Sequence, residues 1–371
     1  MDVLNDETYM KLALDMAESA KGQTGINPVV GCVVVSGGRV VGLGAHLKRG
    51  EGHAEVHALA MAGEQAKGAT VYVTLEPCSH YGRTPPCCER IIEAKASRVV
   101  VASLDPNPLV AGRGVARLRE EGIEVEVGLL GEASQRMNEA FNKFITTGMP
   151  FVTMKTAMTL DGKIAAKTGD SRYVSGPQSR AFVHTLRHQN MAIMIGVQTA
   201  LTDDPELTTR LSVPALHPVR IVVDSKLRLS AQARMVQDGL SPVIVLTVEG
   251  SDPVRKAELA AHGVEVIDCG AGEKVDLRAA LKILGEREIA SILLEGGGLL
   301  NGAMLESGLL DKVILFVAPK LIGGASSPEA FAFGGFDKMS EAIEMTDMTT
   351  ERIGSDICIS GYPKYVQLQG D

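Results

Sequence analysis

The sequence predicts an α/β protein made of two layered domains. Short apolar runs alternate with segments of helical spacing along the chain, a pattern typical of sheets covered by helices. The 371 residues are enough for two domains of ordinary size. Gly148 and Pro150 interrupt the helical pattern of 132–145, so we place the boundary there, giving domains at 1–147 and 148–371.

The first domain is expected to begin its sheet with a hairpin. GCVVV (31–35) and VVGLG (40–44) are separated by Ser-Gly-Gly-Arg, which is a turn signal. Pro85 and Pro86 favour a helix start just before the adjacent cysteines at 87 and 88. Further strands are expected at 70–75, 98–103 and 123–130, and further helices at 53–62, 111–121 and 132–145.

The second domain shows the same alternation, and it contains no internal repeat. Its apolar runs predict strands, and a glycine-rich turn follows one of them. These runs lie at 192–197, 220–225, 242–248, 264–269, 291–298 and 312–324.

The composition restricts the partners and the compartment. The net charge is −8 and no basic run follows the chain, so nucleic acid is not an expected partner. The N-terminus does not resemble a signal peptide, and no apolar run reaches the roughly 18 residues of a membrane span. The six cysteines form no disulfide pattern, which fits a reducing compartment. We expect a cytoplasmic homo-oligomer that acts on a small molecule, with neither nucleic acid nor membrane as a partner.

The stretch EGHAEVHAL (51–59) carries the first candidate metal ligands. His53 and His57 lie four residues apart, so both could bind a metal from one face of the predicted helix. In the two-histidine zinc motif of metalloproteases, however, a glutamate directly follows the first histidine. Ala54 occupies that position here, which removes this interpretation.

The segment TLEPCSHYGRTPPCCER (74–90) supplies a different set of ligands. His53, Cys78 and Cys87 would offer zinc one imidazole and two thiolates and leave a fourth position for water. Cys87 falls at the predicted helix start, where unpaired N–H groups favour a thiolate. His-x-Glu followed by Pro-Cys is also the signature of zinc deaminases.

Glu55 is the predicted catalytic residue of this site. In deaminases the glutamate does not bind the metal; it takes a proton from the attacking water and delivers it to the leaving amine. On a regular helix His53 and Glu55 would diverge by roughly 200°, so we expect His53 at the helix edge, before the helical geometry is complete. The alternative is a structural zinc site, or buried thiols beside a hydrogen-bonded histidine.

Two neighbouring residues are given other roles. We expect His57 to pack against the sheet or to form a nearby hydrogen bond rather than to bind the metal. Cys88 is the nearest rival of Cys87 as a ligand. Because adjacent residues point to different sides, only one of these two cysteines is expected to face the metal.

A set of motifs is distributed over both domains. In the first domain they are NPVVGCVVV (27–35), HAEVHAL (53–59), TLEPCSHYGRTPPCC (74–88) and DPNPLVAGRG (105–114). In the second they are KTAMTLDGKIA (155–165), TDDPELTTR (202–210), IVVDS (221–225) and LLEGGGLLNGAML (293–305). Together they resemble the bifunctional deaminase/reductase family of riboflavin biosynthesis over nearly the whole chain, and the long PCSHYGRTPPC segment is the most specific element.

The resemblance implies two successive reactions on one pathway intermediate. A cytidine-deaminase-like α/β/α domain would bind Zn²⁺ and hydrolyse the 2-amino group of 2,5-diamino-6-ribosylamino-4(3H)-pyrimidinone 5′-phosphate. A dihydrofolate-reductase-like α/β domain would then use NADPH to reduce the ribosyl group to ribityl. Carried over to this sequence, His53, Cys78 and Cys87 would bind zinc and Glu55 would shuttle protons.

The resemblance also implies residues that contact the substrate. In the first domain the candidates are Asn27, His46, His80 and Arg83. Asn27 offers both a donor and an acceptor, and Arg83 could pair with the phosphate; the alternatives are a turn-forming Asn-Pro and a solvated loop cation. In the second domain the implied substrate residues are Ser171, Arg187, Leu207, Arg210 and Glu295. A guanidinium can grip a phosphate with paired hydrogen bonds, which suits Arg187 and Arg210.

The glycines of EGGGLLNGAM (295–304) are the candidate cradle for the cofactor phosphates. They follow a predicted strand and precede a predicted helix, so backbone N–H groups could approach a pyrophosphate, although a tight turn is the alternative. By resemblance, the cofactor positions are Ala157, Tyr173, Thr199, Asp203, Ser225, Gly297, Gly298, Leu299, Leu300, Asn301, Gly302 and Ala303. The family often has tryptophan at the position of Tyr173.

The proton donor of the reduction is left open. Lys155 could be a cation near the reduced carbonyl or an ordinary solvated lysine, and Asp203 is a candidate for protonating the sugar oxygen. Two other functions are considered. One is a nucleotide or tRNA-adenosine deaminase fused to an unrelated reductase, which the acidic charge disfavours for tRNA. The other is a structural zinc module with a nucleotide-sensing domain, which the open fourth coordination position and Glu55 disfavour.

Overall fold

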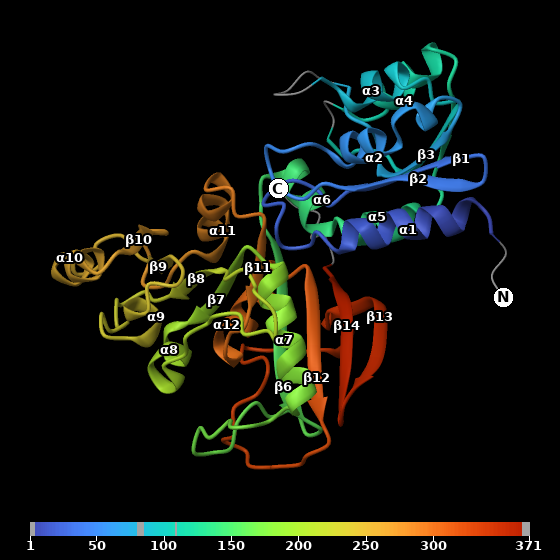
Figure 1. Cartoon of the computed structure of the whole chain (residues 1–371). Coiled ribbons are helices and arrows are strands. Elements are labelled where there is room, and N and C mark those ends of the chain that lie inside the picture. Colours follow the sequence, from blue (N-terminus) through green and yellow to red (C-terminus); the bar gives the residue numbers. More distant parts are fainter. Residues whose placement is uncertain (1–3, 80–84, 108–109, 366–371) are drawn as a thin grey trace. The chain divides into compact units, whose positions relative to one another are not determined.

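The computed structural model describes residues 4–79, 85–107 and 110–365. The chain divides into two compact units, Met1–Met149 and Pro150–Asp371, so the division falls two residues beyond the expected one at 147. Each unit is a helix-covered sheet (Figure 1), and the predicted α/β class is confirmed. Within the described ranges, no helix is both long and apolar enough to cross a membrane.

The first unit is built on a five-stranded sheet of order β2-β1-β3-β4-β5. The β1–β2 and β1–β3 pairs are antiparallel, whereas β3, β4 and β5 run parallel. The strands are β1 (Gly31–Ser36), β2 (Arg39–Ala45), β3 (Thr70–Leu75), β4 (Arg98–Ser103) and β5 (Glu124–Val127). The helices are α1 (Asp6–Glu18), α2 (Ala54–Ala62), α3 (Cys87–Glu93), α4 (Arg113–Glu120), α5 (Gly131–Met137) and α6 (Glu139–Thr147), with a 3-10 turn η1 (Gly63–Ala66).

Alternation along the strands divides this core into two apolar layers. Cys32 and Val34 of β1 face a cluster that includes buried residues of α2, α3 and α4. Val33 and Val35 point to the opposite face, where they pack with Met10 of α1 and its neighbours. Because successive side chains of a strand alternate between faces, an unbroken apolar run is needed to bury both. The result is an α/β/α sandwich.

The second unit contains a nine-stranded sheet of order β10-β9-β8-β7-β11-β6-β12-β14-β13. The strands from β10 to β12 are parallel, and β14 is antiparallel to both β12 and β13. The strands are β6 (Phe151–Thr159), β7 (Ala192–Gly196), β8 (Val219–Val223), β9 (Val243–Thr247), β10 (Val264–Asp268), β11 (Ser291–Leu294), β12 (Lys312–Ala318), β13 (Glu344–Ile353) and β14 (Asp356–Lys364). The helices are α7 (Pro177–Gln189), α8 (Val197–Asp203), α9 (Arg234–Gln237), α10 (Pro253–Ala261), α11 (Leu277–Glu286) and α12 (Gly298–Glu306), with a 3-10 turn η2 (Met339–Glu341).

The hairpin of β13 and β14 is absent from the sequence-based prediction. Strand β13 lies at the sheet edge and is almost entirely exposed, so it lacks the apolar alternation by which strands are recognised. Its pairing with β14 is fixed by the backbone ladder and by contacts such as the Thr349–Ser360 hydroxyl pair, 2.8 Å apart. Tertiary pairing, rather than local pattern, creates this element.

Helix α7 covers the β11–β6–β12 part of this sheet, as Figure 1 shows. Val183 and Leu186 of α7 pack with Leu293 and Phe316. The N-cap residue Gly176 has no side chain to cap the helix, and Asp356 of β14 substitutes for it. Its Oδ2 accepts hydrogen bonds from the Gly176 N–H (2.7 Å) and the Ser179 hydroxyl (2.6 Å).

We expect Asp356→Ala to destabilise the second unit by about 1–3 kcal/mol, because it leaves a half-buried N–H and a buried hydroxyl without their acceptor. Asp356 is 1% exposed. The matched control is Asp252→Ala, which removes the exposed cap of α10 at Val254 N–H and should cost less. Urea unfolding followed by circular dichroism checks this, and an equal loss in both variants would contradict it.

Candidate active sites

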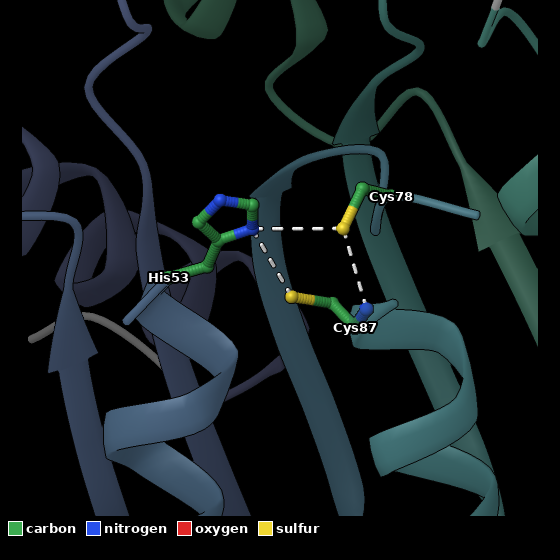
Figure 2. A group of neighbouring side chains, drawn as sticks. All are labelled: His53, Cys78 and Cys87. Atoms are coloured by element: carbon green, nitrogen blue, oxygen red, sulfur yellow. Dashed lines mark hydrogen bonds between the residues drawn. The ribbon is translucent and has the colours of Figure 1, made fainter. Parts of the chain in front are cut away.

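In the first unit, His53, Cys78 and Cys87 converge at one point (Figure 2). The Nδ1 atom of His53 lies 3.6 Å from Sγ of Cys78 and 3.3 Å from Sγ of Cys87. One ligand atom from each residue falls within 4.8 Å of the others. An imidazole nitrogen and two sulfurs at this spacing match the donor set of catalytic zinc sites, which keep one position open.

The backbone explains how these three side chains meet. His53 is the N-cap of α2, with extended backbone angles (φ −73°, ψ 168°), so its position before the regular helix is confirmed. Cys78 follows β3, and Cys87 is the first residue of α3 after Pro86, as predicted. The Cys87 N–H donates to Sγ of Cys78 at 3.3 Å, because the first turn of a helix leaves its N–H groups unpaired.

The two thiols differ in their affinity for a proton. Hydrogen bonds from the Cys87 thiol and backbone, together with nearby His53, lower the pKa of Cys78 to about 4 despite its burial. The same hydrogen bond to the Cys78 sulfur, together with burial, raises the pKa of Cys87. Cys78 is therefore the more acidic of the two thiols, and a bound cation would favour the thiolate form of both.

The neighbours of this group are not part of it. Cys88 packs in the apolar core, and burial raises the pKa of its thiol to about 11. His57 is exposed on α2 and lies outside the ligand group, and a side chain at Gly44 of β2 would come within 3.0 Å of its Cβ. A side chain at Gly52 would contact Nε2 of His57 at 3.2 Å, so the His57 ring lies beside the segment that precedes α2.

Glu55 is buried on the first turn of α2, with 3% of its surface exposed. Burial raises the pKa of its carboxyl group to about 7. Its Oε2 has no hydrogen-bond partner in the described part of the chain. An unpartnered buried carboxylate oxygen beside a metal-ligand group is costly unless a ligand uses it.

Asn27 and His46 form a hydrogen-bonded pair beside the ligand group. Nδ1 of His46 faces the Gly52 carbonyl at 3.3 Å, and its Nε2 faces Nδ2 of Asn27 at 3.1 Å. A carbonyl can only accept, so Nδ1 carries the proton and Nε2 accepts from Asn27. Burial lowers the pKa of His46, which fits this neutral form. The other two predicted substrate residues, His80 and Arg83, lie outside the described residues.

In the second unit, Lys155 in the middle of β6, Arg187 on α7 and Glu295 just after β11 form a largely buried charge cluster. The Arg187 guanidinium donates to both carboxylate oxygens of Glu295, at 2.7 and 3.1 Å. The Lys155 ammonium lies 3.7 Å from the same carboxylate. Although burial opposes ionisation of Glu295, these two cations lower its pKa to about 2. Lys155 is therefore a buried, paired lysine and not a solvated one.

Two of the predicted substrate residues have partners within the protein. Arg187 donates through Nε and Nη2 to Glu295 and through Nη1 to the Thr208 carbonyl, so three of its five N–H groups are already paired. Arg210 is the more exposed of the two arginines, and burial and the nearby Arg187 lower its pKa. Leu207 packs its side chain into the apolar core and is 3% exposed. Only its backbone could face a substrate, because its side chain fills that core.

Three histidines missed by the sequence analysis hold the loop that contains Arg210. His184 and His188 lie on α7, and His217 ends the loop. Their Nδ1 atoms accept hydrogen bonds from the N–H groups of Arg210, Leu216 and Thr209, at 3.2, 3.1 and 3.2 Å. Burial and nearby Arg187 and Arg210 lower the pKa of His184 to about 4, which keeps this acceptor neutral. The four-residue spacing of the two helical histidines was the available signal.

Several predicted cofactor residues meet where adjacent parallel strands end. Thr199 lies on α8 after β7, and Gly297 is the N-cap of α12 after β11. A side chain at Gly297 would lie 3.7 Å from the Thr199 hydroxyl, so the two residues face each other. Carboxyl ends of adjacent parallel strands are the usual place for a ligand in such sheets, and the first N–H groups of α12 favour an anion there.

Two other glycines of this motif also allow a close approach of the backbone. A side chain at Gly298 would come within 2.3 Å of the Glu329 carbonyl oxygen, and one at Gly302 within 2.5 Å of the Ala332 carbonyl oxygen. These glycines let the backbone of 329–332 approach α12. Asn301 is 0% exposed, and its Nδ2 donates to the Ala330 carbonyl at 3.0 Å. At Gly298, Asn301 and Gly302, α12 therefore faces the protein interior.

The remaining predicted residues lie around the same sheet. Ser171 and Tyr173 line a cavity of about 260 Å³ together with Thr159 and Lys320. The Tyr173 ring is stacked by Arg180, whose guanidinium carbon lies 4.1 Å from the ring centre. The other positions are Ala157 in β6, Ser225 just after β8, Asp203 at the end of α8, and Leu299, Leu300 and Ala303 in α12. The Ser225 hydroxyl accepts from the Val275 N–H at 3.1 Å, so it also holds a loop.

Comparisons with known proteins agree over both units. The family model described as the cytidine and deoxycytidylate deaminase zinc-binding region matches residues 4–103, and the RibD C-terminal domain matches residues 150–359. The riboflavin biosynthesis protein RibD of Bacillus amyloliquefaciens is 42% identical over 359 residues, which cover 97% of this chain and 96% of that protein. The RibD protein of Escherichia coli (strain K12) is 41% identical, over 96% of this chain and 99% of that protein.

Solved structures show the same relationship. RibD of Acinetobacter baumannii superposes with a TM-score of 0.86 at 37% identity, covering 97% of this chain and 99% of that one. A diaminohydroxyphosphoribosylaminopyrimidine deaminase/5-amino-6-(5-phosphoribosylamino)uracil reductase from Thermotoga maritima superposes with a TM-score of 0.85 at 36% identity, covering 96% and 98%. The chain therefore belongs to the RibD family, the bifunctional zinc-dependent deaminases and NADPH-dependent reductases of riboflavin biosynthesis.

Proposed function

We propose that His53, Cys78 and Cys87 hold the zinc ion of the deaminase and that Glu55 is its catalytic residue. The observation that carries this assignment is the buried, unpartnered Oε2 of Glu55 beside three converging ligand atoms. When bound, zinc supplies Lewis acidity and makes water nucleophilic at neutral pH. A carboxyl group with a pKa of about 7 can both accept and donate a proton at that pH.

The chain's own residues then manage the protons of the reaction. Glu55 removes a proton from the attacking water and passes it to the exocyclic amine, so that ammonia leaves. Because Glu55 is buried, bulk water does not compete for that proton. The Asn27–His46 pair lies next to His53, whose ring centre is 5.3 Å from that of His46. Through this pair, Asn27 is oriented to hydrogen-bond the pyrimidine, with His80 and Arg83 as further contacts.

We expect Glu55→Gln to retain zinc and to release ammonia from the diaminopyrimidine substrate about 10²–10⁴-fold more slowly, because the amide cannot carry the proton. Ammonia assay and metal analysis measure the two effects. Supplying the deaminated substrate should restore normal NADPH oxidation. Glu51→Gln, an exposed change in the same segment, is the control. Undiminished deamination by Glu55→Gln would remove the proposed role.

The third ligand can be tested by comparing adjacent cysteines. Cys87→Ser should lose zinc, because it removes one of only three protein ligands. Cys88→Ser should keep zinc and lose only some stability, because Cys88 packs in the core. Zinc content after dialysis, with unfolding measured on the same samples, separates the effects. Loss of zinc in Cys88→Ser alone would reverse the assignment.

For the reductase we propose that the start of α12 holds the phosphates of NADPH, near Thr199 and Gly297. When bound, NADPH supplies the hydride. Tyr173, Asp203, Ser225 and Ala157 are proposed to complete the cofactor contacts, with the N–H groups of Gly298, Leu299 and Leu300 facing the pyrophosphate. Within α12, Asn301 and Gly302 contact the 329–332 backbone, and Ala303 is the last of the proposed cofactor positions.

Lys155 is proposed to hydrogen-bond the sugar oxygen and protonate it as the ribosyl group is reduced. Burial lowers its pKa, and the neighbouring Glu295 opposes that effect. Arg187 fixes Glu295 in place through its two hydrogen bonds. Arg210 is proposed to bind the substrate phosphate, with Ser171 and the backbone of Leu207 as neighbouring contacts. The surplus of positive charge in this cluster favours an anionic substrate.

We expect Lys155→Met to lower the reductase rate about 10²-fold or more while deamination continues, because the side chain keeps its length but loses its proton. The measurement is NADPH oxidation with the deaminated substrate, beside ammonia release from the first substrate. Lys256→Met removes an exposed pairing with Asp268 and serves as the control. A normal reductase rate in Lys155→Met would exclude this residue as the proton donor.

We further propose that the protein is a cytoplasmic homo-oligomer. Strand β13 supports association because it leaves one edge of the large sheet exposed, and unprotected edges readily pair. All six cysteines are free, which fits a reducing compartment. Light scattering coupled to size-exclusion chromatography should give at least twice the mass of one chain. A single-chain mass at micromolar concentration would contradict this.

A further inference from the structure

Glu76 is buried at the end of β3 but has no part in the reactions assigned above. Its side chain is 4% exposed, and it directly precedes Pro77 and the proposed ligand Cys78. Both carboxylate oxygens accept two backbone N–H groups. Oε1 accepts from Gly114 (2.8 Å) and Val115 (3.2 Å), and Oε2 accepts from Gly112 (2.8 Å) and Asp105 (3.3 Å). Four donors satisfy this carboxylate without any ligand.

These hydrogen bonds replace the missing cap of α4. The N-cap residue Gly112 has a left-handed backbone (φ 78°) and no side chain that could accept from the helix. Glu76 supplies that acceptor from a different strand, and its negative charge is favoured at a helix N-terminus. The end of β3 is therefore joined to the first turn of α4.

Helix α4 contacts both segments that carry the cysteine ligands. At Gly114, a side chain would lie 2.0 Å from the Pro77 carbonyl oxygen, so the helix touches the backbone just before Cys78. Further along, Arg117 donates to Glu89 of α3 at 2.7 Å, and α3 begins with Cys87. A displacement of α4 would therefore move one cysteine segment relative to the other.

The opposite side of Cys78 is held by α3. The Cys88 N–H donates to the Cys78 carbonyl at 3.2 Å, and the Cys87 N–H donates to its sulfur at 3.3 Å. The Pro77–Cys78 turn is thus fixed between α3 and the Glu76–α4 contact.

We propose that Glu76 is a positioning residue for zinc: it holds the Pro77–Cys78 turn against α4 and so sets the separation of the Cys78 and Cys87 sulfurs. This inference rests on the proposed zinc ligands. It also explains why a glutamate precedes Pro-Cys and how the 105–114 motif contributes to the site. Glu76 accepts hydrogen bonds from the N–H groups of Asp105 and Gly114, at the two ends of that motif.

The test compares Glu76→Gln with the wild-type chain. The amide would direct two N–H donors at backbone N–H groups, so the turn must shift. We expect zinc affinity, measured by competition with a chromophoric chelator, to fall roughly 10- to 100-fold. In the Co²⁺-substituted protein, the thiolate charge-transfer and d–d bands should change, since they report ligand geometry. NADPH oxidation with the deaminated substrate should persist.

Asn138→Ala is the matched control for lost stability. Asn138 is 4% exposed and bonds both the N–H and the carbonyl of Val29, at 2.8 and 3.0 Å, within the same unit. It should lower thermal stability without altering the Co²⁺ spectrum or zinc affinity. If Glu76→Gln binds zinc as tightly as the wild type with an unchanged spectrum, Glu76 only stabilises the fold and the inference is wrong.

Two further variants keep the outcome decisive. If Glu76→Gln does not fold, Gly114→Ala perturbs the same turn from the α4 side, and it should alter the Co²⁺ spectrum in the same direction. An unchanged spectrum there would overturn the inference. Cys78→Ser separates the two proposals. If this variant binds zinc as tightly as the wild type, the ligand assignment fails. If it loses zinc, the ligand assignment holds, and the Glu76→Gln result alone decides whether Glu76 positions the ligands.

Discussion

Beside each proposed active site, the surrounding structure depends on a largely buried carboxylate that follows directly after a strand. Glu76 comes after β3 and binds four backbone N–H groups, whereas Glu295 comes after β11 and binds Arg187 and Lys155. A carboxylate can be buried only if its oxygens are satisfied, so each one fixes the groups around it. The turns that present Cys78 in the first unit and Gly297 in the second begin at these residues.

The electrostatics of Glu55 and Glu295 explain how one residue type fills different roles. Oε2 of Glu55 has no hydrogen-bond partner among the described residues, and burial raises the pKa of this carboxyl group to about 7. Glu295 is largely buried too, but two adjacent cations lower its pKa to about 2. The first can exchange a proton at neutral pH, and the second remains a fixed negative charge. Environment, rather than residue type, decides which carboxylate does chemistry.

The proposed reductase site shows that residues of one motif make contacts that the sequence does not reveal. The glycine run does mark the end of β11 and the start of α12. Gly298 and Gly302, however, accommodate the 329–332 backbone, and Arg187 is committed to Glu295. Arg187 and Glu295 are 108 residues apart, and sequence spacing carries no information about such a pair. The histidines that hold the Arg210 loop bond to backbone N–H groups 8 to 28 residues away, and these bonds leave no apolar pattern in the sequence.

The sequence by itself determined the layered α/β class, the apolar strands, the helix starts at His53 and Cys87, and the residue types of a zinc deaminase. These features are local, because burial on two faces and helix capping leave periodic or adjacent signals. Only the tertiary structure decided that Cys87 rather than Cys88 joins His53, that His57 stays exposed, and that Asp356 and Glu76 cap helices on other elements. It also produced the exposed β13–β14 hairpin. Each of these depends on distant backbone groups that require a partner once they are buried, and no local pattern records which partner that is.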